Sequence, residues 1–199
     1  PFNLPAGSVI LFKEGQTYTQ ATFNGSSLIP ITGNASADRP IFVRSSSRTN
    51  QAVIARDMMV SGSYIVVENL KFKEASVGLP LSYDTRSDGF PPGDTHHIAI
   101  RNLEMDGGNA GPMGLIGLGS GAGPYSPSGL GPFKVEDVAI YNNHMHNFGE
   151  WQGDEETDNV GVSVGVYNTF RTYIFDNDIS YLGGDSVRIG GNNPARLNG

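Results

Sequence analysis

The chain has 199 residues, with 27 glycines, 12 prolines and no cysteine. Its length suits one domain that depends on packing and backbone pairing, because neither disulfides nor thiolate metal sites are available. The net charge is -7, from 20 acidic and 13 basic residues, and no run rich in lysine or arginine occurs, which argues against a nucleic acid as partner. No apolar run approaches the roughly 20 residues of a membrane span.

An internal repeat organises the chain. Its units alternate apolar and variable residues up to a polar anchor, and a further apolar residue follows three positions later, in segments 65–72, 98–105, 138–145 and 172–179. The anchors are Asn69, Asn102, Asn142 and Asp176. Alternation predicts a half-buried strand before each anchor, and the later apolar residue indicates a bend around one core.

Two later segments, "GVSVG" at 161–165 and "SVRIG" at 186–190, read as a second strand within the unit. Ser163 and Arg188 are 25 residues apart, whereas Asn142 and Asp176 are 34 apart, which indicates a nine-residue insertion at 149–158. The same subtraction places insertions in 107–132 and 82–94. The pattern predicts coils of about 25 residues, with loops on one side.

Coils of this size, without helical periodicity, predict an all-β fold in which parallel strands stack at about 4.8 Å. We expect the stacked anchors to form a ladder at one corner, where their side chains hydrogen-bond from coil to coil and satisfy corner amides. Residues 1–199 then form a single solenoid domain.

Two glycine-rich motifs have ordinary interpretations. "GVSVG" matches a nucleophile signature around Ser163, but alternating valines and the lack of a following helix predict a continuous strand. "GLGSGAG" at 117–123 resembles a phosphate cradle, but Pro124 and Pro127 follow where a helix should begin. We interpret it as a flexible loop.

His144 and His146 flank the inward-facing Met145, so both should point outward on one face. They could bind a metal or transfer a proton, and we take His146 as a candidate catalytic residue and His144 as a substrate contact. The alternative is a solvated surface pair.

The insertion at 149–158 carries carboxylates whose oxygens suit calcium, and the predicted ligands are Glu150, Asp154, Glu155, Glu156 and Asp158. A solvated acidic loop is the alternative. Trp151 lies in the same loop, where its indole either stacks on a sugar ring or packs against the wall of the solenoid.

Arg188 occupies the position equivalent to Ser163 in the preceding coil. Its guanidinium suits bidentate bonds to a carboxylate or sulfate. A salt bridge to Asp185 or to the acidic insertion explains the same residue equally well.

The anchored coils resemble those of right-handed parallel β-helix proteins of the pectate-lyase-like superfamily, across roughly residues 8–190. "GSVILFKEGQTYTQATF", "ADRPIFVRSSS" and "GGDSVRIGG" are similar to segments of the alginate lyase and chondroitin B lyase family. This resemblance implies a secreted or cell-surface lyase of an acidic polysaccharide, in which Arg188 holds a uronate carboxylate. The family's catalytic base, its arginine partner and its calcium-binding acids lie on later coils and have no match here.

The expected groove contains Arg188, Ser163 and Asp185 between walls at 106–134 and 149–158. A glycoside hydrolase is one alternative, with Asp158 and Asp185 as its pair of carboxylates. A non-catalytic adhesive or filament-forming solenoid is another.

Segment 190–199 contains neither an amphipathic helix nor a charged strand that would shield the last coil. We therefore expect this end to continue into further coils, or to stack against another chain.

Overall fold

The computed structural model describes residues 2–23, 28–80, 94–108, 114–120, 134–148, 160–164 and 169–189. Within these ranges the protein is all-β, apart from one turn of 3-10 helix, η1 (Gln20–Phe23). The paired strands described below are all parallel. None of the described segments forms a helix that is long and apolar enough to cross a membrane.

The strands form three ladders, each named here after its last strand. The β16 ladder contains β2 (Val9–Phe12), β5 (Ile41–Ser45), part of β7 (Asp57–Glu68), β10 (Thr95–Arg101), β13 (Val135–Tyr141) and β16 (Thr169–Phe175). The β17 ladder contains β3 (Thr17–Tyr18), β6 (Val53–Ile54), β8 (Lys71–Lys73), β11 (Glu104–Asp106), β14 (His144–Phe148) and β17 (Asp178–Leu182). The β18 ladder contains β1 (Phe2–Asn3), β4 (Leu28–Asn34), the rest of β7, β9 (Val77–Pro80), β12 (Gly114–Ser120), β15 (Val160–Val164) and β18 (Asp185–Ile189).

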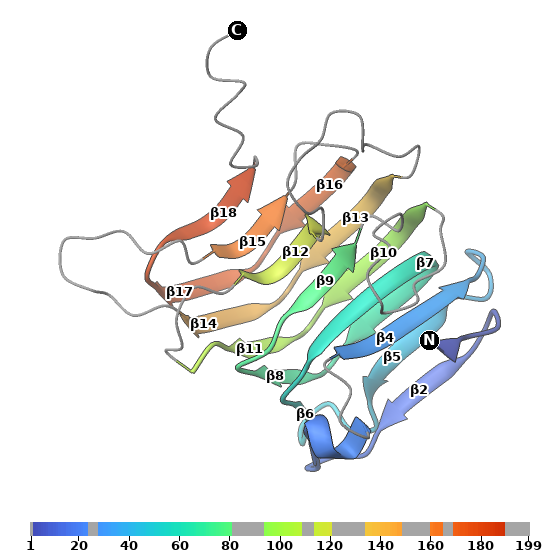
Figure 1. The fold of residues 1–199 in the computed structure, drawn as a ribbon, viewed down its shortest axis with the longest axis horizontal. Coiled ribbons are helices and arrows are strands. Elements are labelled where there is room, and N and C mark those ends of the chain that lie inside the picture. Colours follow the sequence, from blue (N-terminus) through green and yellow to red (C-terminus); the bar gives the residue numbers. More distant parts are fainter. Residues whose placement is uncertain are drawn as a thin grey trace, which may run out of the picture.

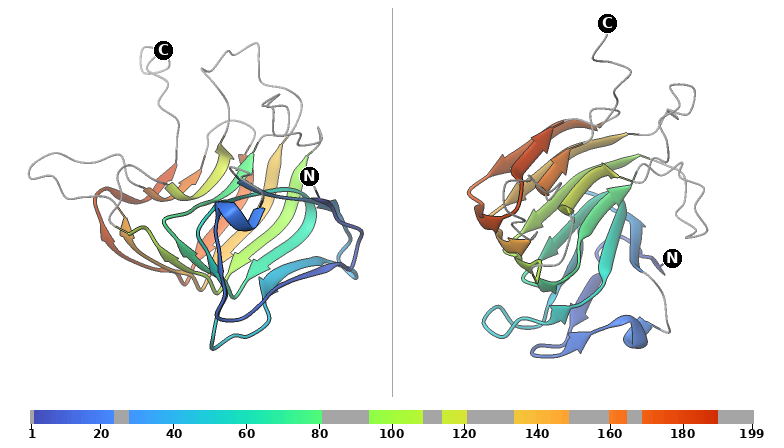
Figure 2. Two further views of the ribbon diagram at one scale, coloured as in Figure 1. Left: turned by 60° about the horizontal axis from the view of Figure 1, so that its bottom comes forward. Right: turned by 60° about the vertical axis from the view of Figure 1, so that its left-hand side comes forward.

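Successive coils contribute one strand to each ladder, as β13, β14 and β15 do before β16, β17 and β18 repeat the order. The long strand β7 joins two ladders, because its first half pairs with β4 and its second half with β5 and β10. Figure 1 shows the strands side by side in a curled sheet, and Figure 2 shows this solenoid-like curvature from two further directions. All segments outside the described ranges adjoin the β18 ladder or the chain ends in sequence.

The core follows from the predicted alternation. In the β16 ladder, Ile65, Ile98 and Val138 lie in register and are buried. The residues two positions later on the same strands are buried as well. In the β17 ladder the inward row is Phe72, Met105, Met145 and Ile179. Burying such rows on successive coils supplies the main stabilisation that a chain without disulfides can use.

The predicted row of anchors is confirmed. Asn69, Asn102, Asn142 and Asp176 follow residues that are in register, and all four adopt φ between 53° and 55°. Asparagine and aspartate tolerate this left-handed conformation better than most residues, which explains the pattern. The predicted side-chain hydrogen bonds between coils come from the residue that follows the anchor. The side chains of Asn143 and Asn177 hydrogen-bond to backbone groups of the preceding coil.

A second left-handed position recurs inside the strands of the β16 ladder. Tyr64, His97, Asp137 and Arg171 have φ of 48–55° and occupy one row between residues that pair regularly. The register is the same on both sides of this row, so the stacked strands share one kink at this position. On β10 the kink places Thr95 and Ile98, three residues apart, both in the core. The alternation pattern did not predict this kink.

The interpretation of "GLGSGAG" as a flexible loop is wrong for its first four residues. Residues 117–120 belong to β12, which pairs with β9 on one side and β15 on the other. Ile116 and Leu118 are buried in the core, so packing and two-sided pairing outweigh the low strand propensity of the glycines. Ser163 lies in β15, within a continuous strand as predicted, and residues 121–123 lie outside the described ranges.

The expectation about segment 190–199 concerns residues outside the described ranges. Val187 and Ile189 of β18 are in register with the buried Val162 and Val164, yet both are exposed. Their exposure reflects the place of β18 at the end of its ladder, beyond which no described strand lies.

Candidate functional site

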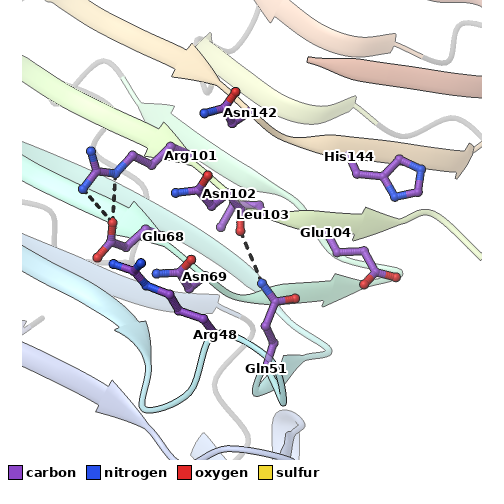
Figure 3. Close-up of a pocket in the computed structure, with 10 residues that line it drawn as sticks. All are labelled: Arg48, Gln51, Glu68, Asn69, Arg101, Asn102, Leu103, Glu104, Asn142 and His144. Atoms are coloured by element: carbon purple, nitrogen blue, oxygen red, sulfur yellow. Dashed lines mark hydrogen bonds and ion pairs between the residues drawn. The ribbon is translucent and has the colours of Figure 1, made fainter. Parts of the chain in front are cut away.

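An open groove of about 590 Å³ lies on the outer surface, over the corner that the anchors form. Its lining comes from the β16 ladder, the β17 ladder and the turn between β5 and β6, and comprises Arg48, Gln51, Glu68, Asn69, Arg101, Asn102, Leu103, Glu104, Asn142 and His144. We call it the corner groove. Figure 3 shows the row of asparagines running through it, with Arg101, Glu68 and Arg48 on one side and Glu104 and His144 on the other. Its size is that of a small-molecule site.

One side of the corner groove is held by a nearly buried carboxylate. Glu68 accepts hydrogen bonds from Nε of Arg101 at 2.8 Å and from Arg44 at 3.3 Å. Arg101 also donates to the hydroxyl of Tyr141 at 2.8 Å. The bond to Tyr141 and the contacts with Glu68 raise the pKa of Arg101, despite partial burial, so this guanidinium stays charged and is fixed in place.

The other side opens onto what we call the histidine cluster: Lys71, Glu104, His144, His146 and Asp178, from four successive strands of the β17 ladder. Lys71 Nζ lies 2.6 Å from Glu104 Oε1, and that oxygen lies 3.7 Å from Nε2 of His146. The two imidazole rings stack, with centroids 4.4 Å apart and planes inclined by 27°. As predicted, both histidines point outward from one strand while Met145 is buried between them.

The two histidines differ in exposure. The side chain of His144 is 50% exposed, whereas that of His146 is 14% exposed. Among the described residues, Nε2 of His146 is one of two buried side-chain polar atoms that lack a hydrogen-bond partner. Such an atom is uncommon in folded proteins and marks a position where a catalytic role is worth testing.

Asp106 borders the cluster, and its surroundings favour the charged carboxylate. Burial raises its pKa, but the amide of Gly108, the side chain of Asn147 and the charges of His146 and Lys71 outweigh this effect and hold the pKa below its ordinary value. His146 on β14 therefore lies close to two carboxylates of the preceding coil, Asp106 and Glu104 of β11.

Ser163 and Arg188 are directly paired on β15 and β18, as their spacing predicts. Nε of Arg188 donates to Asp185 at 2.6 Å, so the salt bridge expected as one alternative is present. These residues belong to the β18 ladder, whereas His144 and His146 belong to the β17 ladder. The structure thus distributes the predicted site residues over two outer surfaces.

The remaining predicted site residues lie outside the described ranges. They are Trp151 and the acidic residues Glu150, Asp154, Glu155, Glu156 and Asp158. Within the ranges that are described, no group of three or more histidine or acidic side chains is placed to hold a metal ion.

The sequence analysis did not predict most of the corner groove. One row of its residues could have been predicted from the aligned repeats. Lys71, Glu104, His144 and Asp178 each lie two residues after an anchor, so the aligned repeats already place them in one outward row. Arg48 lies in an irregular turn, where no periodicity indicates its position.

The chain matches no protein-family model, no curated protein and no solved structure.

Proposed function

We propose that this protein is a secreted or cell-surface right-handed parallel β-helix of the pectate-lyase-like type, and that it cleaves an acidic polysaccharide by β-elimination. The observation that carries the proposal is the presence of His144, backed by His146 and Glu104, in one groove with Arg48. β-Elimination needs a cation that neutralises the uronate carboxylate, a base for the proton at C5 and an acid for the leaving oxygen.

In the proposed reaction a uronate lies over Asn102, with its carboxylate toward Arg48. Neutral His144 removes the C5 proton, the bond from C4 to the glycosidic oxygen breaks, and a double bond forms between C4 and C5. The imidazolium then returns the proton to the leaving oxygen. A histidine suits both steps because its ordinary pKa lies close to neutrality.

The rest of the cluster positions the base. Lys71 holds Glu104, Glu104 faces Nε2 of His146, and the ring of His146 supports that of His144. His146 and Glu104 act through His144 in this scheme, so we class them as positioning residues.

Arg188 binds a second carboxylate of the same polymer. Asp185 fixes the plane of its guanidinium through Nε, and Ser163 is its neighbour in register. Because the β18 ladder is a separate surface, Arg188 contributes to affinity and not to the chemical step.

The test is incubation with alginate, chondroitin and pectin, with and without calcium, while the absorbance of the unsaturated product is followed. We expect one substrate to give product. His144→Ala should lower kcat by about 100-fold or more, in line with the usual contribution of a general base. Arg188→Ala should raise KM and leave kcat nearly unchanged.

His96→Ala is the matched control, because His96 lies on β10 outside the corner groove, and it should retain full activity. Full activity in His144→Ala would remove the corner groove from the mechanism. New reducing ends without an unsaturated product would identify a hydrolase. Failure to bind or cleave any of the three polymers would favour a scaffold.

Calcium enters the proposal through the acidic segment 149–158. If its carboxylates hold the ion, chelation should lower activity and calorimetry should detect calcium binding. Unchanged activity with a chelator and no heat of binding would remove calcium from the proposal.

A further inference from the structure

A second outer surface carries exposed aromatic side chains. Phe170, Tyr173 and Phe175 of β16 are 46%, 55% and 47% exposed. Their partners on β13 are Glu136, Ala139 and Tyr141, whereas the inward Ile174 pairs with the buried Ile140. The three rings therefore point away from the core, and a coil stacked beyond β16 would lie beside them and would not cover them.

Phe175 continues the row of Arg101 and Tyr141 along the stacking direction, and so links the exposed rings of β16 to the corner groove. Phe175 stacks on Tyr141, with centroids 4.9 Å apart and planes inclined by 5°. Tyr141 accepts a hydrogen bond from Arg101, which lines the groove. The surface thus passes from a hydrogen-bonding region to an aromatic region within three coils.

The row of Tyr173 has short side chains on the two preceding coils. Tyr173 is in register with Ala139 and then with Ala99, both half-buried on the outer side. Because alanine side chains are short, they leave space beside one face of the Tyr173 ring. A flat ligand could contact the ring there.

The charges around the aromatic rings are already paired. Arg171 binds Asp137 at 2.6 Å and Glu136 at 2.9 Å, and Arg101 binds Glu68. Two carboxylates thus surround the single guanidinium of β16. This environment does not favour an acidic ligand.

We infer that Phe170, Tyr173 and Phe175, together with Tyr141 beside Phe175, form a binding surface for a neutral glycan, which lies along β16 and meets the corner groove at Tyr141. A neutral sugar combines apolar C–H faces, which suit aromatic rings, with hydroxyl groups, which suit Arg101 and the asparagine amides. Charged pairs interrupt the aromatic rings, which distinguishes this surface from the continuous apolar patch typical of a protein interface. The inference goes beyond the proposed function, because it requires no cleavage.

The test is calorimetric titration of the full chain with neutral cello-, manno- and xylo-oligosaccharides. We expect at least one to bind. Tyr173→Ala and Phe175→Ala should each weaken binding about tenfold, the equivalent of about 1.4 kcal/mol, while Tyr173→Phe keeps the ring and should retain affinity. Near-ultraviolet circular dichroism and thermal unfolding verify that the variants remain folded.

Val9→Ala and Leu11→Ala are matched controls, because these exposed residues occupy the same two rows at the other end of the ladder. Both should bind normally. The titration measures binding without cleavage, which separates this inference from the proposed lyase activity. The inference is wrong if no neutral oligosaccharide binds, or if Tyr173→Ala and Phe175→Ala bind unchanged. Equal binding of an acidic oligosaccharide at these rings, or self-association that Tyr173→Ala abolishes, would also overturn it.

Discussion

Asn143 and Asn177 occupy the same position on successive coils, and Nδ2 of Asn143 donates to Oδ1 of Asn177 at 2.9 Å. Each carboxamide also binds the backbone of the coil before it. Asn177 donates to the carbonyl of Ile140, and Asn143 donates to that of Ile100. Oδ1 of Asn143 accepts from the N–H of Leu103 at 3.0 Å. The side chains thus satisfy backbone groups at a corner where the strands have ended.

Asn143→Leu tests this role. Leucine has a similar shape and already occupies the equivalent position in earlier coils, at Leu70 and Leu103, where it is buried. The variant therefore retains packing but leaves the N–H of Leu103 without its acceptor. We expect the free energy of unfolding in urea to fall by about 1–3 kcal/mol.

Asn142 provides the control, because it is exposed and its side chain is not part of this network. Asn142→Gly keeps the left-handed conformation and should change stability by less than about 0.5 kcal/mol. Equal losses in Asn143→Leu and Asn142→Gly would contradict the assigned role of Asn143.

Gly62 lies at a close approach of β4 and β7. It pairs with Gly33, its φ is 116°, and a Cβ atom at this position would overlap the carbonyl oxygen of Gly33. Both the backbone conformation and the contact therefore exclude a side chain. Gly62→Ala should lower the thermal midpoint markedly, by the equivalent of more than about 1 kcal/mol. A midpoint equal to that of the wild type would show that the two strands can separate without cost.

The coils and their anchors were predictable because both signals are local. Alternation around Ile98 and Val138 fixes the buried face, and the left-handed preference of Asn102 and Asn142 fixes the corner. β12 was not predictable in the same way, since "GLIGLGS" has low strand propensity and becomes a strand through its pairing with β9 and β15.

The candidate site was only partly predictable. The outward direction of His144 and His146 follows from the buried Met145 between them. Their relation to Glu104 depends on the register of two coils, which becomes readable once the anchors are aligned. The place of Arg48 depends on a turn with no repeat, so only the three-dimensional structure brings it into the corner groove.

Glu68 provides a test of the ion pairs at the groove. Its side chain is almost fully buried between Arg44 and Arg101. Glu68→Gln keeps the size of the side chain but removes the charge that both guanidinium groups bind. We expect a loss of about 1–3 kcal/mol in urea unfolding, because charged donors would then lack their partner.

Glu104→Gln is the control for this loss. Glu104 pairs with Lys71 where both side chains are about one-third exposed, so its loss should cost less than about 1 kcal/mol. If both variants lose the same stability, burial does not decide the strength of these pairs.

Asp137 and Arg171, at the kink of β13 and β16, give a prediction for acid conditions. Hydrogen bonds and the charge of Arg171 are the main cause of a lowered pKa at Asp137, and His97 and His96 add to the effect. Since the ordinary pKa of aspartate is about 3.9, the pair contributes stability above that pH. This contribution is lost as the pH falls through the lowered pKa of the folded state.

Arg171→Gln should therefore raise the pKa of Asp137 toward its ordinary value, which NMR titration of the carboxyl carbon measures directly. The thermal midpoint of the variant should lie below that of the wild type near neutral pH, and the difference should vanish below the lowered pKa. Arg48→Gln removes an exposed arginine elsewhere and should leave the titration of Asp137 unchanged. An unchanged pKa of Asp137 in Arg171→Gln would mean that the guanidinium does not determine its charge. In that case the shared left-handed kink, and not the ion pair, would have to account for the alignment of these two residues on successive coils.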